Sequence, residues 1–225
     1  MNDKQCVAEH AASLVKDGML VGLGTGSTAN YFIDALAGRS AAEGLQIQVV
    51  ASSVVSSIKA QQAGLRLVAL EQISRLDLYV DGADEVTPDM TLLKGRGADL
   101  VREKLLAKAA DVFWVLIDTS KRVHHIGQNY PIPLEVMPFA WRLVQTSVAE
   151  IGGQCKLRPG ANGEGLAVTS YGSLVLDATF ETEIESSVLS GQLDAIPGII
   201  EHGIFSGLAT AIFCGHEVKV LEQWR

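Results

Sequence analysis

The residues best suited to chemistry lie in "LLKGRGADLVREKLLA", residues 92–107. Lys94 stands directly before a Gly-Arg-Gly turn, and the turn leads into a segment with helical spacing that carries Glu103. Glycines allow backbone N–H groups to approach a ligand closely, a lysine can stabilise a negatively charged oxygen, and a glutamate can accept a proton. Taken alone, this stretch fits either a surface helix with solvated charges or a small oxyanion site with its own base.

The helix expected over residues 98–110 indicates where Glu103 points. On a helical wheel, the buried stripe of this segment is expected to contain Ala98, Val101, Leu105 and Ala109. Glu103 falls away from the centre of that stripe, so we expect it to face either solvent or a cleft.

A second polar cluster is "GLGTGSTA", residues 22–29, between a predicted strand and a predicted helix. Free N–H groups at a helix start, together with three hydroxyl groups, favour an anion. A dinucleotide-binding fingerprint would need glycine where Ser27 stands and an acid after the next strand, and a P-loop would need a lysine. The remaining alternatives are a loop for one small phosphate and a tight turn that binds nothing.

A third cluster is "YVDGADEV", residues 79–86, in which Asp81 and Asp84 directly follow a predicted strand. Ligands of open parallel sheets bind beyond the carboxyl ends of the strands, so two such acids can hold the hydroxyl groups of a polyol. The alternative is an Asp-Gly turn with solvated acids. A metal site is not expected, because no histidine has ligand spacing near these acids. The histidines are His10, His124, His125, His202 and His216.

Composition and charge limit the class of protein. The chain has 225 residues, 48% of them hydrophobic, and a formal net charge of −8, with no Lys/Arg cluster longer than a dipeptide. A nucleic-acid surface is therefore not expected. Three widely separated cysteines predict reduced thiols. No apolar run reaches the roughly 20 residues of a membrane span, and the N-terminal segment lacks the apolar core of a signal peptide. We expect a soluble, cytoplasmic protein.

The elements that must position these residues alternate between strand and helix in the first half of the chain. The expected strands are 19–24, 47–52, 65–70, 76–82 and 112–120, and the expected helices are 4–16, 27–38, 53–64 and 98–110. This alternation is typical of an α/β fold whose parallel sheet is covered on both faces.

The pattern changes near Gly127, where prolines in "NYPIPLEVMP" interrupt any helix. Helices at 139–153 and 183–195, with strands between them, indicate a small α+β domain. The apolar last segment is expected to return to the main sheet. The predicted domains are therefore 1–128 plus 205–225, a Rossmann-like catalytic domain, and 129–204, the smaller α+β domain inserted near the C-terminus.

These motifs together resemble the type A ribose-5-phosphate isomerases. The matching stretches occur in order over essentially the whole chain: "GLGTGSTA" (22–29), "YVDGADEV" (79–86), "KGRGADLVREK" (94–104), "IDTSK" (117–121), "PIPLEV" (131–136) and "IPG…HGIF" (196–205). The resemblance implies a Rossmann-like domain with an inserted α+β domain, a homo-oligomer such as a dimer or tetramer, and no metal or other cofactor. It also implies interconversion of ribose 5-phosphate and ribulose 5-phosphate in the non-oxidative pentose phosphate pathway.

The resemblance also implies roles for individual residues. Glu103 is similar in position to the family's general base, and Asp81, Asp84 and Lys94 resemble its polar catalytic companions. The positions that match its substrate-binding segments are Thr25, Gly26, Ser27, Thr28, Asp81, Gly82, Ala83, Asp84, Lys94, Gly95, Arg96, Gly97 and Lys121. Lys4 is a further candidate, although no motif anchors its alignment.

The implied chemistry suits these side chains. One carboxylate can remove a proton from one carbon and return it to its neighbour through a cis-enediolate, so a single glutamate suffices. Lys94 and the N–H groups of the following turn can stabilise the enediolate oxygen. Asp81 and Asp84 can manage hydroxyl protons and ring opening.

Two positions depart from the family pattern: Arg96 replaces the middle one of three glycines, and Asp99 replaces a small residue. We expect Arg96 to be tolerated if the turn contributes only its backbone, and Arg96 or Arg102 to neutralise Asp99. Alternative functions are a catalytically impaired family member, a sugar-phosphate-binding sensor, and a deaminase or lactonase. A deaminase or lactonase would need a histidine near the Asp81 turn, which the sequence lacks.

Overall fold

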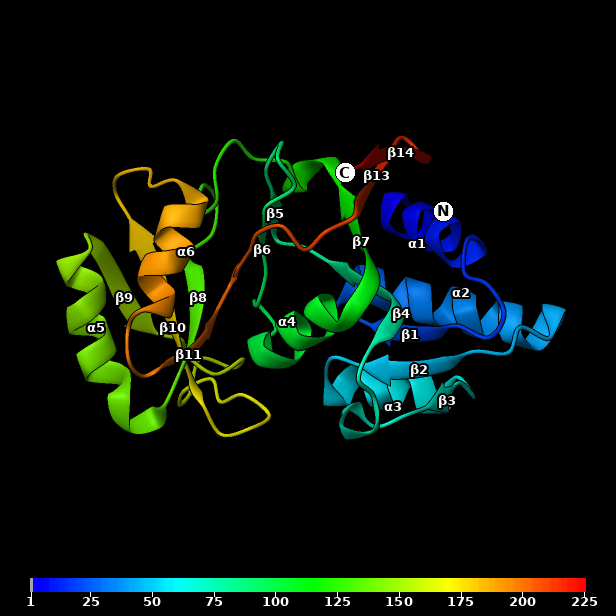
Figure 1. Ribbon diagram of the computed structural model, residues 1–225, viewed down its shortest axis with the longest axis horizontal. Helices are drawn as coiled ribbons and strands as arrows, with labels where there is room; N and C mark the ends of the chain where they lie inside the picture. Colours follow the sequence, from blue (N-terminus) through cyan, green and yellow to red (C-terminus); the bar gives the residue numbers. More distant parts are fainter. Residues whose placement is uncertain (1) are drawn as a thin grey trace. The chain divides into compact units, whose positions relative to one another are not determined.

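A computed structural model describes residues 2–225 of the chain (Figure 1). The chain forms two compact units. The first unit comprises the residues up to Ala83, Arg102–Lys121 and Leu208–Arg225, and the second comprises Asp84–Val101 and Arg122–Gly207. The two domains proposed from the sequence, 1–128 plus 205–225 and 129–204, stay a prediction about how the chain divides into folding units.

The first unit contains a seven-stranded sheet with the order β14-β13-β7-β4-β1-β2-β3. All neighbours run parallel except β13 and β14, which form an antiparallel hairpin at one edge. The strands are β1 (Leu20–Leu23), β2 (Gln48–Ala51), β3 (Arg66–Leu67), β4 (Leu76–Gly82), β7 (Ala110–Asp118), β13 (Ala211–His216) and β14 (Lys219–Trp224). The predicted α/β class is confirmed, and the last segment of the chain joins the main sheet as expected.

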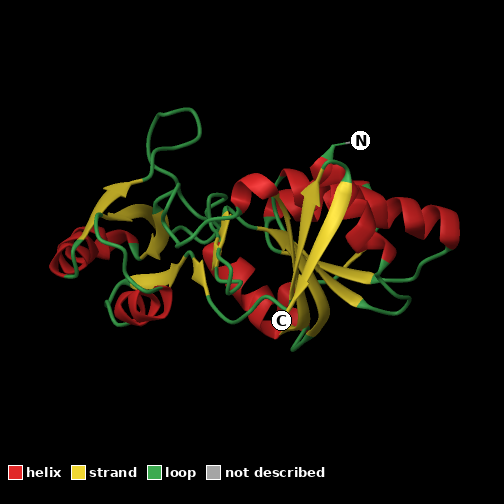
Figure 2. Cartoon of the chain, turned by 90° about the horizontal axis from the view of Figure 1, so that it is seen from above, coloured by secondary structure: helices red, strands yellow, loops and turns green. Residues whose placement is uncertain are grey.

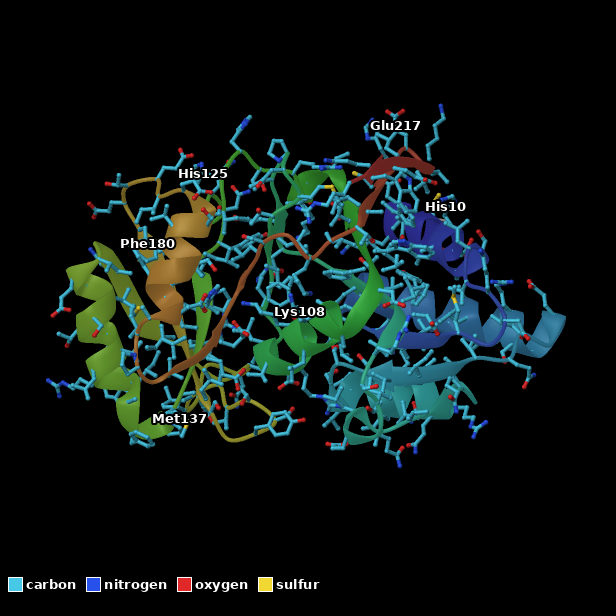
Figure 3. All side chains as sticks on the ribbon, viewed as in Figure 1. His10, Lys108, His125, Met137, Phe180 and Glu217 are labelled. Atoms are coloured by element: carbon cyan, nitrogen blue, oxygen red, sulfur yellow. The ribbon has the colours of Figure 1, made fainter. Side chains whose placement is uncertain are left out.

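Helices cover this sheet because its strands are apolar on both faces (Figure 2). The helices of the first half are α1 (Asp3–Ser13), α2 (Ser27–Glu43), α3 (Val54–Gln62) and α4 (Leu100–Ala109), and η1 (Leu70–Gln72) is a 3₁₀ turn. α1 packs against β7, β13 and β14, where Nε2 of His10 lies 2.7 Å from Oε1 of Glu222 (Figure 3 labels His10). The core beneath α1 and α2 includes Val21, Phe32, Leu36, Val80 and Phe213, each fully buried.

The second unit contains a four-stranded antiparallel sheet of order β11-β8-β10-β9 and a three-stranded sheet of order β12-β6-β5. The strands are β5 (Glu85–Val86), β6 (Leu92–Leu93), β8 (Ile132–Val136), β9 (Gly153–Leu157), β10 (Leu174–Phe180), β11 (Ile199–His202) and β12 (Ile204–Phe205). Its helices are α5 (Trp141–Glu150) and α6 (Ser186–Asp194), with η3 (Pro138–Ala140) before α5, while η2 (Thr119–Lys121) closes the preceding first-unit segment. Antiparallel strands with helices beside them match the small α+β block predicted from the sequence.

None of the helices in residues 2–225 combines the length and the hydropathy of a membrane span.

Candidate active site

Asp81 is held rigidly at the carboxyl end of β4 in the first unit. Its Oδ1 accepts hydrogen bonds from the N–H of Thr25 at 3.1 Å and the N–H of Gly82 at 2.7 Å. Its Oδ2 accepts a hydrogen bond of 2.5 Å from the hydroxyl of Tyr79. Asp81 is only 1% exposed. A buried carboxylate with three donors is fixed in orientation, which suits a group that must act on one atom of a ligand.

The glycines of the "GLGTGSTA" stretch allow this close contact between β1, the following loop and β4. A Cβ on Gly22 would lie 2.7 Å from the ring of Tyr79, and a Cβ on Gly24 would lie 2.0 Å from Oδ1 of Asp81. The N–H of Gly24 also donates to the carbonyl of Val80 at 2.8 Å. The glycine-rich loop and the Asp81 turn, which the sequence presents as separate motifs, therefore form one packed structure.

This contact makes a stability prediction. Gly24→Ala forces either the loop or the Asp81 carboxylate to move, so we expect the free energy of unfolding to fall by about 1–3 kcal/mol. Gly38→Ala is the matched control, because Gly38 lies inside α2 with no atom within 4 Å of an added Cβ. That variant should gain about 0.5–1 kcal/mol, since alanine is the better helix former. Urea denaturation measures both, and equal stability of Gly24→Ala and the parent would contradict the tight contact.

The side chain of Thr25 belongs to a buried cluster of hydroxyl groups. Its Oγ1 lies 2.9 Å from Oγ of Ser52, 2.7 Å from Oγ of Ser53 and 3.1 Å from Oγ of Ser56. Ser56 in turn donates to the carbonyl of Gly24 at 2.6 Å. These serines fix the glycine-rich loop against the carboxyl end of β2. The polar clusters predicted from the sequence do not include them, although serine pairs directly after a strand are a usable signal.

The start of α2 offers donors to an anion. Gly26, at φ +117°, caps this helix without a side-chain hydrogen bond to its first turn. The ammonium of Lys4, on α1, donates to Oγ of Ser27 at 3.1 Å. Unbonded N–H groups at a helix start and an adjacent cation both favour a phosphate. The structure thus brings Lys4 to the loop that the sequence suggested for a small phosphate.

Glu103 lies on the buried face of α4, which contradicts the helical wheel drawn from the sequence. Glu103 is 4% exposed and follows the spacing of the buried residues Leu100, Leu106 and Ala107, whereas Leu105 is 52% exposed. Lys108 also lies on the exposed side of α4, where Figure 3 labels it. The predicted stripe was wrong because it counted only apolar residues, and a buried carboxylate does not appear in such a count.

Tyr79 links Asp81 and Glu103 electrostatically. Burial raises the pKa of the Tyr79 phenol well above 10, and the negative charges of Asp81 and Glu103 raise it further. Its ring stacks on Phe113 with the centroids 4.8 Å apart. The phenol therefore stays protonated and donates to Asp81 at any physiological pH. Sequence reasoning missed this residue, because a tyrosine within a strand has the pattern of an ordinary core residue.

Lys94 lies in the second unit directly after β6, opposite Gly203, which precedes β12. Its N–H donates to the carbonyl of Gly203 at 2.9 Å, and a Cβ on Gly203 would lie 2.4 Å from the carbonyl oxygen of Lys94. The side chain is 4% exposed, and its ammonium lies 5.7 Å from the centroid of the Phe205 ring. The "HGIF" motif therefore positions Lys94, with glycine required at 203 by the close backbone approach. The backbone of Asp84 is bonded to the strand that precedes Lys94, because its N–H donates to the carbonyl of Leu93 at 2.8 Å.

The turn after Lys94 is closed by a 3.1 Å hydrogen bond from the N–H of Ala98 to the carbonyl of Gly95. Gly95 has φ +98°, and a Cβ there would lie 2.0 Å from Leu100. Arg96 is not one of the described residues that have positive φ, and its guanidinium stacks on the Tyr130 ring, 4.4 Å from the centroid. The backbone of Arg96 therefore suits a non-glycine residue, and its side chain is occupied elsewhere in the second unit.

Comparison with known proteins agrees with the motifs. The model of a family described as ribose 5-phosphate isomerase A (phosphoriboisomerase A) matches residues 48–219. Ribose-5-phosphate isomerase A of Thermococcus kodakarensis is 41% identical over 224 residues, which cover 98% of this chain and 97% of that protein. The chain belongs to the ribose 5-phosphate isomerase A family.

Solved structures of this family have the same fold. The ribose 5-phosphate isomerase A of Methanocaldococcus jannaschii matches with a TM-score of 0.94 at 36% identity, covering 99% of this chain and 98% of that one. A D-ribose-5-phosphate isomerase in complex with phospho-erythronic acid matches with a TM-score of 0.95 at 35% identity, covering 100% of both chains.

Asp99, one of the two positions that depart from the family pattern, has a hydrogen-bond partner that the sequence did not suggest. Oδ1 and Oδ2 of Asp99 accept hydrogen bonds of 3.0 and 2.9 Å from the N–H and the hydroxyl of Ser170. Arg102 donates to the carbonyl of Ala51 at 3.0 Å, and Arg96 stacks on Tyr130. The prediction that Arg96 or Arg102 neutralises Asp99 is therefore wrong, and Asp99 instead fastens the hairpin tip at 169–172.

The residues that the family resemblance selects divide between the two units. The first unit contains Thr25, Gly26, Ser27, Thr28, Asp81, Gly82, Ala83, Glu103 and Lys121, and the second contains Asp84, Lys94, Gly95, Arg96 and Gly97. The chain passes from one unit to the other four times, at Ala83–Asp84, within α4 at Val101–Arg102, at Lys121–Arg122 and at Gly207–Leu208. Lys121, which ends η2, is partly buried.

Away from these residues, Asp194, Glu201 and His202 place their ligand atoms within 4.8 Å of one another. Nδ1 of His202 accepts a 3.2 Å hydrogen bond from the N–H of Ile204, so its proton lies on Nε2, which faces Oδ1 of Asp194 at 3.1 Å. A metal would need that nitrogen unprotonated. The arrangement is that of a hydrogen-bonded histidine that anchors β11 next to Gly203.

Proposed function

We propose that this chain is an aldose–ketose isomerase that interconverts D-ribose 5-phosphate and D-ribulose 5-phosphate by proton transfer through an enediolate. The observation that carries the proposal is the position of Glu103, a carboxylate on the buried face of α4. Its negative charge helps to raise the pKa of Tyr79, the hydrogen-bond donor to Asp81. Full-length similarity to named ribose-5-phosphate isomerases supports the choice of substrate. A carboxylate held away from bulk water is the group that such a proton transfer needs.

In the proposed reaction, Glu103 removes the proton from C2 of the open-chain aldose, and the electron pair of that C–H bond forms the enediolate double bond. The C1 oxygen takes up negative charge and then a proton. Glu103 returns its proton to C1, while the C2 hydroxyl loses its proton and becomes the ketone. The atoms balance with one base and no external oxidant, because the aldose and the ketose are isomers and each proton removed is matched by one returned.

The other selected residues act on oxygen atoms. Lys94 and the N–H groups of the 95–97 turn stabilise the negatively charged enediolate oxygen. Asp81 and Asp84 bind the sugar hydroxyl groups and carry protons during ring opening. Thr25 to Thr28, with Lys4, hold the phosphate at the start of α2. Gly82, Ala83 and Lys121 complete the substrate-binding set, with Lys121 as a further cation for the substrate.

A steady-state assay tests the proposal. We expect the purified protein to convert ribose 5-phosphate at a kcat on the order of 1–10³ s⁻¹, the usual range of enzymes. Phospho-erythronic acid, present in the related structure, should inhibit competitively, because its planar carboxylate resembles the enediolate. Binding of both compounds without turnover would instead favour the sensor or the catalytically impaired family member. The absence of both binding and turnover would overturn the proposal.

A homo-oligomeric state, as a dimer or tetramer, and a cytoplasmic location also stay predictions. Size-exclusion chromatography with light scattering measures the first of these directly.

A further inference from the structure

Arg158, the residue directly after β9, holds the turn that follows Lys94. Its Nη1 donates to the carbonyl oxygen of Gly95 at 2.9 Å and to that of Arg96 at 3.2 Å. The other side of its guanidinium pairs with Asp177 on β10, through a 2.9 Å bond from Nε to Oδ2 and a second bond from Nη2 to Oδ1. All of these residues lie within the second unit.

The pair is well placed to be rigid. The side chains of Arg158 and Asp177 are 15% and 22% exposed, and a bidentate arginine–carboxylate pair fixes the plane of the guanidinium. The backbone of Arg158 is also bonded on both sides, from its N–H to Val175 and from the N–H of Ala167 to its carbonyl, each at 2.9 Å. Nη1 therefore has a defined position from which it donates to the turn.

Because Arg158 fixes two carbonyl groups of the turn, it also fixes the direction of the N–H groups in the same peptide planes. In a trans peptide the C=O of one residue and the N–H of the next point in opposite directions. Arg158 holds the carbonyls of Gly95 and Arg96, so the N–H groups of Arg96 and Gly97 must point away from Arg158. Among the described residues these two N–H groups have no protein acceptor, whereas the next one, of Ala98, is used to close the turn.

We infer that Arg158 is a positioning residue of the isomerase, which aims the N–H groups of Arg96 and Gly97 as a donor pair for the enediolate oxygen. The inference rests on the proposed function. It gives a role to an arginine that contacts only the carbonyl oxygens of the turn, on the side opposite to the two N–H groups. It also explains how an arginine is accepted at position 96. The site uses the N–H of that residue, and its side chain lies on Tyr130.

The test compares Arg158→Ala and Arg158→Lys with the parent and with Arg142→Ala, a control at an exposed arginine of α5 in the same unit. We expect kcat to fall by about 10–100-fold in Arg158→Ala, because a donor displaced by an ångström loses that much. KM should change by less than about threefold, since the turn acts on charge that develops in the transition state. Arg142→Ala should behave like the parent.

Chemical rescue separates positioning from folding. Guanidinium at low, non-denaturing concentration should restore kcat of Arg158→Ala by about tenfold, because it can refill the gap between Asp177 and the two carbonyls. It should not restore Glu103→Gln. Arg158→Lys should also be slow, since one ammonium cannot bridge Asp177 and both carbonyls. This variant keeps the test valid if Arg158→Ala does not fold.

Binding of phospho-erythronic acid gives a readout independent of turnover. We expect Arg158→Lys to bind it about tenfold more weakly than the parent, because the compound needs the same donors. Parent-like kcat and inhibitor affinity in Arg158→Lys, or a loss in Arg158→Ala that guanidinium does not restore, would overturn the inference. Failure of the proposed function has a different signature: the parent itself would neither turn over ribose 5-phosphate nor bind the inhibitor.

Discussion

Glu103→Gln is expected to lower kcat for ribose 5-phosphate by about 10²–10⁴-fold, the contribution of a positioned general base. Glutamine has nearly the same shape as glutamate, so the buried face of α4 stays packed, but its amide cannot accept the proton from carbon. KM should stay within about threefold of the parent, because the substrate's phosphate and hydroxyl groups are held by other residues. A coupled assay of ribulose 5-phosphate formation measures both constants.

The matched control for this variant is Glu150→Gln at the exposed end of α5. It makes the same chemical change on a helix without the proposed chemistry, and it should keep parent-like kcat and KM. Proton exchange at C2 provides a second readout, because Glu103→Gln should lose exchange of the C2 hydrogen with solvent to the same degree as turnover. Unchanged kcat in Glu103→Gln would rule out Glu103 as the base.

Lys94→Met is expected to lower kcat by about 10²–10³-fold, which is the usual effect of removing one oxyanion donor from an enzyme. Methionine preserves most of the length and the apolar stem of the side chain, so it fits the same buried position while removing the charge. Lys94 is 4% exposed, and its backbone bond to Gly203 does not depend on the side chain. We therefore expect the melting temperature to change little while kcat falls.

The affinity for phospho-erythronic acid checks the Lys94 prediction independently. If Lys94 stabilises the enediolate oxygen, the variant should bind this compound about 10²-fold more weakly. Lys156→Met, at an exposed lysine of β9 in the same unit, should bind like the parent and serves as the control. If the Lys94→Met protein has parent-like kcat, Lys94 is not a donor to the enediolate oxygen, and the N–H groups of the turn stabilise that oxygen alone.

The class of fold could be predicted from the sequence because it depends on local patterns. Strands such as β1 and β4 are short apolar runs, since a parallel sheet is covered on both faces. The helices between them carry their own periodicity and caps. Ser53, for example, caps α3 through a 3.1 Å bond from the N–H of Ser56. None of these signals requires knowledge of a distant residue.

The position of Glu103 could not be predicted in the same way. A helical wheel ranks residues by hydropathy, so it selected the exposed Leu105 and placed the buried Glu103 off the stripe. A buried carboxylate is stable only where other groups offset its loss of hydration. Local hydropathy periodicity contains no information about such groups, so the burial of Glu103 could be seen only in the folded chain.

The amino-acid sequence by itself determined the α/β architecture, the three polar turns and the glycines that make them tight, because each of these follows from neighbouring residues. Only the tertiary structure decided that Gly24 packs against Asp81, that Tyr79 donates to that carboxylate, and that Arg158 holds a turn more than sixty residues earlier in the chain. Such contacts form between segments far apart in sequence. Their partners are therefore chosen by the packing of the folded chain.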